Sequence, residues 1–203
     1  MTAAPTAAKK LPPLWVTWTI ITAVGSAIFG ALTTLVNGEP QGLFMSVLVG
    51  GLIVGGLEWR SLRHYRVPVS PLWCAAKAIM MLILFGVVMA GMAFAVEGWT
   101  YLLLPVCGCL LDGARGWLLR SHLPYTKRWV IGCAIGWFIE LGLLAGAGII
   151  TLGLFDAGAN HTLFFALNGA INGAWMGFCR GVVLTGMLSD RHQHREPSPS
   201  VEF

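Results

Sequence analysis

Charged residues are scarce in this chain. Asp, Glu, Lys and Arg make up 11% of its 203 residues, whereas hydrophobic residues make up 56%; soluble domains carry about 25% charged residues. So few charges exclude a soluble domain of this length, because they would not cover its hydrophobic core. The composition is typical of an integral membrane protein. The 26 glycines and nine tryptophans fit spanning helices, in which Gly permits close packing and Trp lies at the membrane surface.

Several functional motifs are also missing. The net charge of +4 does not predict nucleic-acid binding, because the basic residues form no long run. The five cysteines are odd in number and dispersed through apolar segments, so we expect neither a disulfide framework nor a metal site. No Ser, His and Asp lie together at one membrane depth, and no nucleotide-binding motif is present. We therefore expect the chain not to be an enzyme and to have no cofactor, no bound metal and no nucleic-acid partner.

Six mostly apolar stretches are long enough to cross a bilayer, which takes about 20 residues as a helix. Polar or turn-forming segments separate them, and Ser70 followed by Pro71 is a typical helix start. The sequence therefore predicts an all-α integral membrane protein with six transmembrane helices, at about Leu14–Val36, Gly42–Trp59, Leu72–Val96, Tyr101–Leu119, Trp129–Leu154 and Leu163–Leu188.

Lys and Arg are absent from alternate connections. The connections after the first, third and fifth stretches contain Glu39, Glu97 and Asp156 but no basic residue. Most of the 13 Lys and Arg residues lie at the ends of the chain and in the other connections, namely Lys9, Lys10, Arg60, Arg63, Arg66, Arg120, Lys127, Arg128, Arg191 and Arg195. Because such residues stay on the cytoplasmic side of a membrane, we expect both termini to be cytoplasmic (N-in, C-in). The expected location is a bacterial-type inner membrane or plasma membrane.

Similar motifs recur along the chain. The odd-numbered stretches begin at Pro13-Leu14-Trp15, at Pro71-Leu72-Trp73 and at Arg128-Trp129. The even-numbered stretches carry Gly55-x-x-x-Trp59, Gly113-x-x-x-Trp117 and Gly173-x-x-x-Gly177. We therefore expect three tandem helical hairpins around a pseudo-three-fold axis along the membrane normal. They form one membrane domain over residues 12–190, with hairpins at about 12–66, 70–124 and 126–190. Residues 1–11 and 191–203 are expected to be flexible tails.

The recurring residues have expected roles in packing and anchoring. Glycines let neighbouring helices approach closely, and the expected packing positions are Gly55, Gly113, Gly173 and Gly177. We expect these contacts within the bundle; a dimerisation face is the alternative. The expected interfacial anchors are Trp15, Trp59, Trp73, Trp117 and Trp129. Several charged side chains near the ends of the stretches are expected to extend toward the lipid headgroups, namely Glu58, Arg63, Lys77, Arg120 and Arg180.

Polar side chains at membrane depth are candidates for function, because they are costly to bury in lipid. Asp112 and Arg115 share one face of a helix, as do Asn168 and Asn172, and Glu140 lies near the middle of its stretch. We expect these five residues to line a central axis and to bind a substrate or an ion. In the alternatives, Arg115 pairs with Asp112 or with Glu140 in a purely structural cluster, the cluster relays protons, or it contacts a partner subunit.

These features favour two functions. The first is a small permease or solute-binding membrane subunit that uses the buried polar cluster. The alternative is a non-catalytic accessory or scaffold subunit of a larger membrane complex, with glycine-rich faces as docking surfaces. The expected partners are the lipid bilayer and either other membrane subunits or a second copy of the chain.

Overall fold

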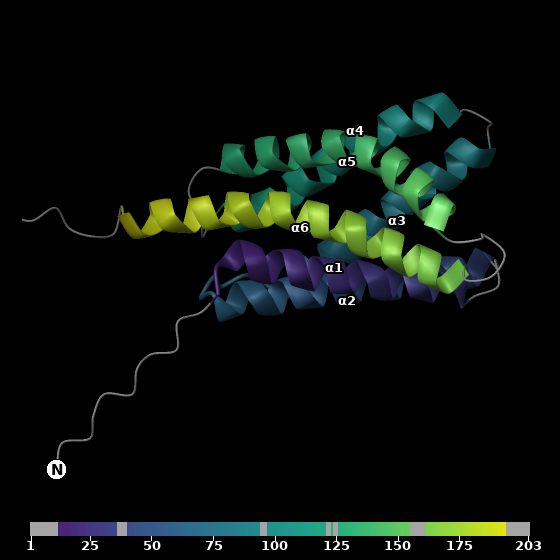
Figure 1. Cartoon of the computed structure of the whole chain (residues 1–203). Coiled ribbons are helices and arrows are strands. Elements are labelled where there is room, and N and C mark those ends of the chain that lie inside the picture. The colour runs from purple at the N-terminus through teal and green to yellow at the C-terminus, as the bar shows by residue number, and fades with distance from the viewer. Residues whose placement is uncertain are drawn as a thin grey trace, which may run out of the picture.

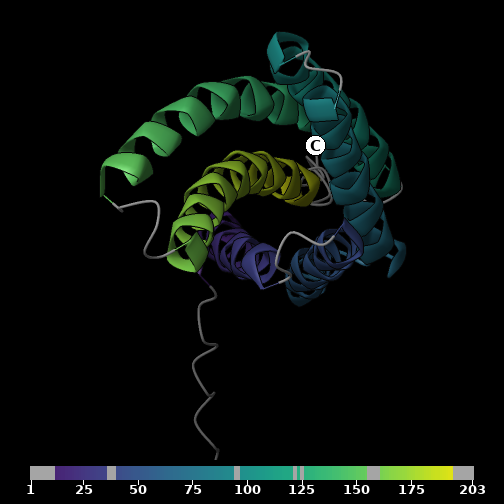
Figure 2. The same ribbon diagram turned by 90° about the vertical axis from the view of Figure 1, so that its right-hand side faces the viewer.

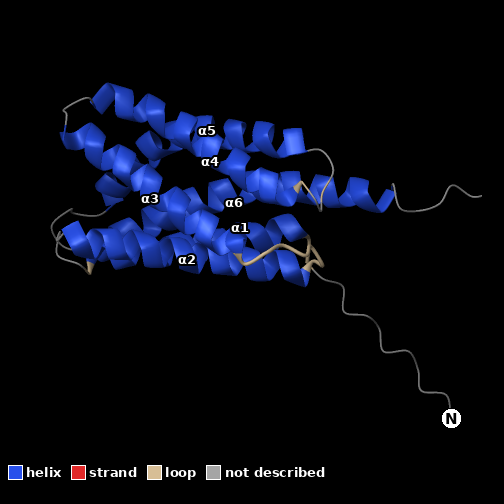
Figure 3. Ribbon diagram, turned by 180° about the vertical axis from the view of Figure 1, so that it is seen from behind, coloured by secondary structure: helices blue, strands red, loops and turns tan. Residues whose placement is uncertain are grey.

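The computed structural model describes residues 12–35, 40–93, 97–120, 123, 126–154 and 161–193. Within these ranges the chain consists of helices joined by short turns (Figure 3). The predicted tail 1–11 and residues 194–203 of the other predicted tail lie outside the described residues. The helices are α1 (Leu14–Thr34), α2 (Pro40–His64), α3 (Leu72–Ala93), α4 (Glu97–Leu119), α5 (Thr126–Leu154) and α6 (His161–Gln193).

Each predicted apolar stretch corresponds to one helix. α2 and α6 continue past the apolar residues to His64 and Gln193, since a helix does not need to end where its apolar run ends. At the start of α3, the backbone N–H of Leu72 donates a hydrogen bond to Ser70 Oγ at 3.3 Å, as a helix cap does. Among the described residues, three helices are long and apolar enough to cross a membrane, namely α1, α2 and α3.

The six helices form a closed ring. Each helix packs on the one before and the one after it in the chain, and α6 packs extensively on α1 (Figure 1). Figure 2 shows this succession nearly along the helix axes. Consecutive helices run in opposite directions, so the starts of α1, α3 and α5 meet the ends of α2, α4 and α6 at one end of the ring. We call this the basic end, because exposed basic residues gather there, namely Arg60, Arg63, Arg66, Arg120, Lys127 and Arg128.

Glycines lie at the closest contacts between helices. A Cβ atom added to Gly177 of α6 would lie 2.9 Å from Thr19 Cα of α1, and one added to Gly173 would lie 2.6 Å from Ser26 Cβ. A Cβ atom on Gly55 of α2 would lie 2.9 Å from Cys74 Cα of α3. Gly113 differs, because the nearest atom of a neighbouring helix to a Cβ added there would be Val130 Cγ2, at 4.0 Å. Among the described residues, no neighbouring helix packs closely against Gly113. The Gly-rich face of α6 is therefore covered by α1.

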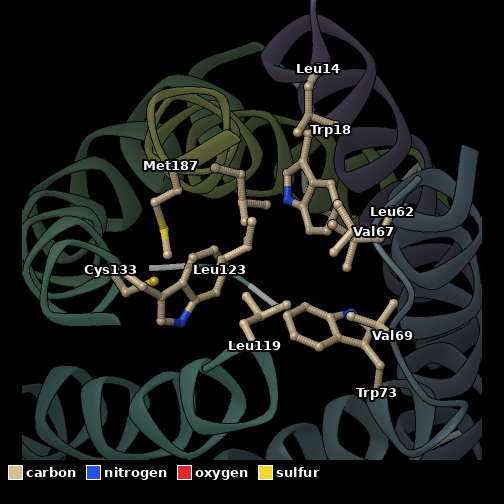
Figure 4. Close-up of a cluster of buried hydrophobic side chains, with 12 residues drawn as sticks. Leu14, Trp18, Leu62, Val67, Val69, Trp73, Leu119, Leu123, Cys133 and Met187 are labelled. Atoms are coloured by element: carbon tan, nitrogen blue, oxygen red, sulfur yellow. The ribbon is translucent and has the colours of Figure 1, made fainter. Parts of the chain in front are cut away.

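The basic end is filled by an apolar cluster, shown in Figure 4. Three tryptophan rings from alternate helices meet in it edge to face. The centroids of Trp18 and Trp73 are 6.5 Å apart, and those of Trp73 and Trp129 are 6.2 Å apart. The remaining members come from the other five helices and from two connections, since α3 contributes only Trp73. They are Leu14, Leu62, Val67, Val69, Leu119, Leu123, Cys133, Leu184 and Met187.

The tryptophans correct part of the anchor prediction. Trp15 and Trp117 are 38% and 56% exposed, and Trp59 is partly buried. Trp73 and Trp129 are only 1% and 0% exposed, so they are core residues and not interfacial anchors. Both side chains point into the ring, where their apolar rings fill its interior. Their indole N–H groups donate hydrogen bonds there, Trp73 to Glu58 and Trp129 to the backbone carbonyl of Asp112. The first helix contributes Trp18 to this cluster, not Trp15.

Candidate functional site

Five charged side chains from four helices meet inside the ring, next to the apolar cluster. None is more than 4% exposed. Glu58 lies on α2, Lys77 on α3, Asp112 and Arg115 on α4, and Arg180 on α6. We call these five residues the ion network. Burying charged groups away from water is costly unless they are paired, so the partners of each group matter.

Asp112 is the acceptor at one side of the network. Its Oδ2 atom accepts hydrogen bonds from Arg180 Nη2 at 2.6 Å and from Trp137 Nε1 at 2.8 Å. Its Oδ1 atom accepts a bond from Arg115 Nη1 at 3.3 Å. The backbone carbonyl of Asp112 also accepts a hydrogen bond from Trp129 Nε1 at 2.7 Å. The same residue thus ties α4 to α5 and α6.

Glu58 is the acceptor at the other side. Its Oε2 atom accepts hydrogen bonds from Arg115 Nη2 and, at 3.1 Å, from Trp73 Nε1. Its Oε1 atom lies 3.7 Å from Lys77 Nζ. Arg115 therefore bridges the two carboxylates, and its guanidinium carbon lies 4.1 Å from the centre of the Trp73 ring. Such a cation–π contact stabilises a buried guanidinium.

Three members of the network differ from the sequence-based expectation. Glu58, Lys77 and Arg180 do not extend to the surface, because their helix positions face the ring interior and meet opposite charges there. Arg63 and Arg120 are exposed. The signal in the sequence was the placement of single charges inside apolar runs. The position of a charge within an apolar run predicts how far along the helix it lies. It does not predict whether the side chain points into the ring or outward.

Glu140 of α5 stands apart from the network. Its Oε2 atom is buried and has no hydrogen-bond partner in the described part of the chain. The expected alternative partner, Arg115, is bound instead to Glu58 and Asp112. The network has two acidic and three basic members, so its formal charge is +1. Glu140 is a further acidic residue close to Lys77 and Arg180 of the network.

The two predicted asparagines lie together on α6. Asn172 Nδ2 donates a hydrogen bond to Asn168 Oδ1 at 3.0 Å. Asn172 Oδ1 is buried without a partner, as Glu140 Oε2 is. Two unpartnered buried oxygens in one region are uncommon, since buried polar atoms are nearly always hydrogen-bonded.

A cavity of about 190 Å³ lies beside these two residues. It lies between α1, α3, α5 and α6, and both Glu140 and Asn172 line it. Lys77 and Arg180 of the ion network line it too, together with Thr22, Ser26, Phe29, Met80, Met81, Trp137, Gly169, Gly173 and Met176. The cavity therefore has hydrogen-bond acceptors and cationic groups on its walls. Asp112 and Arg115 do not line it. Asp112 binds Arg180 at the cavity wall, and Arg115 binds Glu58 behind that wall.

A second cavity, of about 620 Å³, lies toward the end of the ring opposite the basic end. It shares Phe29, Gly169 and Asn172 with the smaller cavity, so the two lie end to end. Asn168 and the exposed His161 also line it. The two cavities thus lie next to each other, between the opposite end of the ring and the ion network. Beyond the network, the apolar cluster fills the basic end.

Polar and charged side chains from both sequence-predicted groups lie on the cavities or next to them. Within the described ranges, no three His, Cys, Asp or Glu side chains gather in a group that would hold a metal ion. The described cysteines are all free thiols. Of the five predicted site residues, Glu140, Asn168 and Asn172 lie on the cavities, and Asp112 and Arg115 lie in the network behind them. Comparisons with protein-family models, with curated proteins and with solved structures find no match to this chain.

Proposed function

We propose that the chain is an integral membrane protein whose six helices all span the bilayer. Three helices meet the length and apolarity of a span by themselves. α4 and α6 carry charges within their apolar runs, but Asp112, Arg115 and Arg180 are at most 2% exposed and paired inside the ring. The outer surface exposes large apolar side chains on every helix, as a lipid-facing surface does.

The proposed orientation puts the basic end in the cytoplasm. The exposed basic residues gather at that end, which agrees with the distribution of basic residues around bacterial membranes. The proposed three-hairpin repeat has partial support from Trp73 and Trp129, which occupy related places in the apolar cluster. The first hairpin departs from the repeat, because Trp18 and not Trp15 joins them.

A reporter at the C-terminus tests the number of crossings. A C-terminal green fluorescent protein is expected to fluoresce, and a C-terminal alkaline phosphatase to be inactive, because six crossings return the chain to the cytoplasm. As a control, an epitope inserted after Gly38 should be reached by a reagent that does not cross the membrane. An active C-terminal phosphatase would contradict the proposal, since three crossings put that terminus outside.

We further propose that the cavity beside the ion network binds a small polar solute, as part of a permease or solute-binding membrane subunit. The observation that carries this is that Glu140 and Asn172, each with one buried and unpartnered oxygen, line one cavity together with Lys77 and Arg180. Small rotations of the two side chains would turn these oxygens into the cavity. An amine on the solute would bond to the two oxygens, and an acidic group would lie near the two cations. The chemistry favours a small zwitterion.

The geometry also favours a direction of entry. The larger cavity gives access from the end opposite the basic end, and the apolar cluster fills the basic end. Transport across the membrane would require a second conformation in which that cluster opens. The alternative role, as an accessory subunit docked through glycine faces, has less support because α1 covers the glycine face of α6.

Glu140→Gln tests the solute proposal. Binding of labelled glycine, alanine and serine to the purified protein is measured, with ethylamine and acetate as solutes that carry one charge. At least one of the amino acids is expected to bind the native protein, and the variant to bind it about tenfold more weakly or worse, because the amine loses its charged acceptor.

Asp190→Asn is the matched control for this test. Asp190 is a carboxylate at the basic end that pairs with Arg128, away from the cavity. Its neutralisation should leave the affinity unchanged. Equal affinity in the native protein and in Glu140→Gln, or binding of none of the three amino acids, would overturn the assignment of this cavity.

A further inference from the structure

A groove between α1 and α2 at the basic end has a distinctive lining. It encloses about 560 Å³, and its walls include Ile21, Leu57, Arg60, Ser61, Arg63 and His64. The polar groups among these are cations or hydrogen-bond donors, and the groove has no carboxylate in its lining. Such a set of groups suits an anionic ligand with several acceptor oxygens.

Ser61 is an independent sign of a ligand in this groove. The residue is only 6% exposed, and its Oγ atom is buried without a hydrogen-bond partner in the described ranges. Nearly all buried hydroxyl groups are hydrogen-bonded. A change of the Ser61 rotamer would turn this hydroxyl toward the groove, where a ligand oxygen would accept the missing bond.

The two arginines of the groove are free to bind such a ligand. Arg60 and Arg63 are exposed, and neither forms an ion pair in the part of the chain that the structure describes. The guanidinium carbon of Arg63 lies 5.2 Å from the centre of the Trp59 ring, which holds that side chain near the helix. The acid closest in sequence, Glu58, is buried in the ion network and is not available to them.

An apolar strip continues the groove away from the basic end. Ile21 and Leu57 form its beginning. Val24 and Ile28 follow Ile21 at helical spacing on α1 and are 50% and 40% exposed, and Val49 on α2 is 41% exposed. A flexible hydrocarbon chain would cover these side chains along the helix surface.

We propose that this groove binds one anionic phospholipid, with its phosphate at Arg60, Ser61 and Arg63 and an acyl chain along the apolar strip. The combination of cationic donors at the membrane surface and apolar groups toward the bilayer centre matches that class of lipid. A soluble anion would use the first half of the site but not the second. The proposal depends on the proposed membrane setting and is independent of the solute cavity.

Lipid retention by the purified full-length protein tests the proposal. The protein is exchanged into detergent with phosphatidylglycerol, phosphatidylcholine or glycerol 3-phosphate, and bound lipid and thermal unfolding are measured. Phosphatidylglycerol is expected to be retained about tenfold more than phosphatidylcholine and to raise the unfolding temperature. Glycerol 3-phosphate, which lacks the acyl chains, is expected to have little effect.

Variants locate the site. The double variant Arg60→Gln/Arg63→Gln should lose the preference for phosphatidylglycerol. Ser61→Ala should weaken it without lowering the unfolding temperature of the lipid-free protein, because the hydroxyl has no partner to lose. Arg120→Gln is the matched control, since Arg120 is also exposed at the basic end and stacked on a tryptophan, 4.0 Å from the Trp117 ring centre.

Three results would overturn the proposal. The first is equal retention of phosphatidylglycerol and phosphatidylcholine. The second is an equal loss of lipid preference in Arg120→Gln, because that result would indicate diffuse charge attraction. The third is full stabilisation by glycerol 3-phosphate, because that result would indicate a soluble anion as the ligand. Glu140→Gln separates this site from the solute cavity. That variant should keep the lipid preference whether or not it binds a solute.

Discussion

Arg115→Leu is expected to lose about 3–5 kcal/mol of the free energy of unfolding, which is the usual cost of breaking a buried ion pair by removing one partner. Arg115 is 1% exposed and bridges Glu58 and Asp112. Without it, Glu58 keeps only Lys77, at 3.7 Å, as a cationic partner. Domains are stable by about 5–15 kcal/mol, so much of this variant should unfold or aggregate. Thermal unfolding and size-exclusion profiles in mild detergent measure the effect.

A triple variant separates the loss of ion pairing from the loss of packing. Arg115→Leu/Glu58→Leu/Lys77→Leu removes the bridging cation together with Glu58 and the other cation that pairs with Glu58, while Asp112 retains Arg180. This triple variant should be clearly more stable than Arg115→Leu alone, because buried ion pairs can often be replaced by apolar groups. Arg120→Leu, at an exposed position, should change the free energy of unfolding by about 0.5 kcal/mol or less. Equal stability of the single and triple variants would show that charge pairing is not the cause.

Trp73→Ala is expected to cost about 3–5 kcal/mol, the usual range for removing a buried Trp side chain. Trp73 is 1% exposed and lies between the rings of Trp18 and Trp129. Its N–H donates to Glu58, and its ring faces the Arg115 guanidinium. The substitution therefore removes apolar packing at the basic end and one partner of the ion network together.

Trp117→Ala is the matched control for this effect. Trp117 also carries an arginine on its ring, since the Arg120 guanidinium carbon lies 4.0 Å from its centre, but Trp117 is 56% exposed. Both variants lose a cation–π contact, so the difference between their unfolding temperatures measures burial and the bond to Glu58. A similar small shift in both variants would contradict the placement of Trp73 in the core.

Much of the helical framework could be predicted because it depends on local properties. The lengths of the apolar runs gave the six helices, and α1, α3, α4 and α5 begin or end within a few residues of the predicted positions. The pairing of Asp112 with Arg115 was one of the stated alternatives, because residues three apart on a helix are neighbours. The spacing of glycines indicated close packing at Gly55, Gly173 and Gly177.

The rest of the site could not be predicted, because it depends on contacts between helices far apart in the sequence. Glu58 meets Arg115, and Asp112 meets Arg180, only after the ring is assembled. The apolar run around Lys77 contained no information on the direction of its side chain, which points to Glu58. The choice of Trp18 over Trp15 for the apolar cluster has the same origin, since both lie in the first turns of α1.

The amino-acid sequence alone therefore determined the helices and the distribution of charge along the chain, because helix formation and hydropathy depend on near neighbours. Only the tertiary structure decided which face of each helix turns inward. The closure of α6 on α1 brings Lys77, Glu140, Asn172 and Arg180 around one cavity. Their grouping arises from the packing of the whole ring, which no local segment specifies.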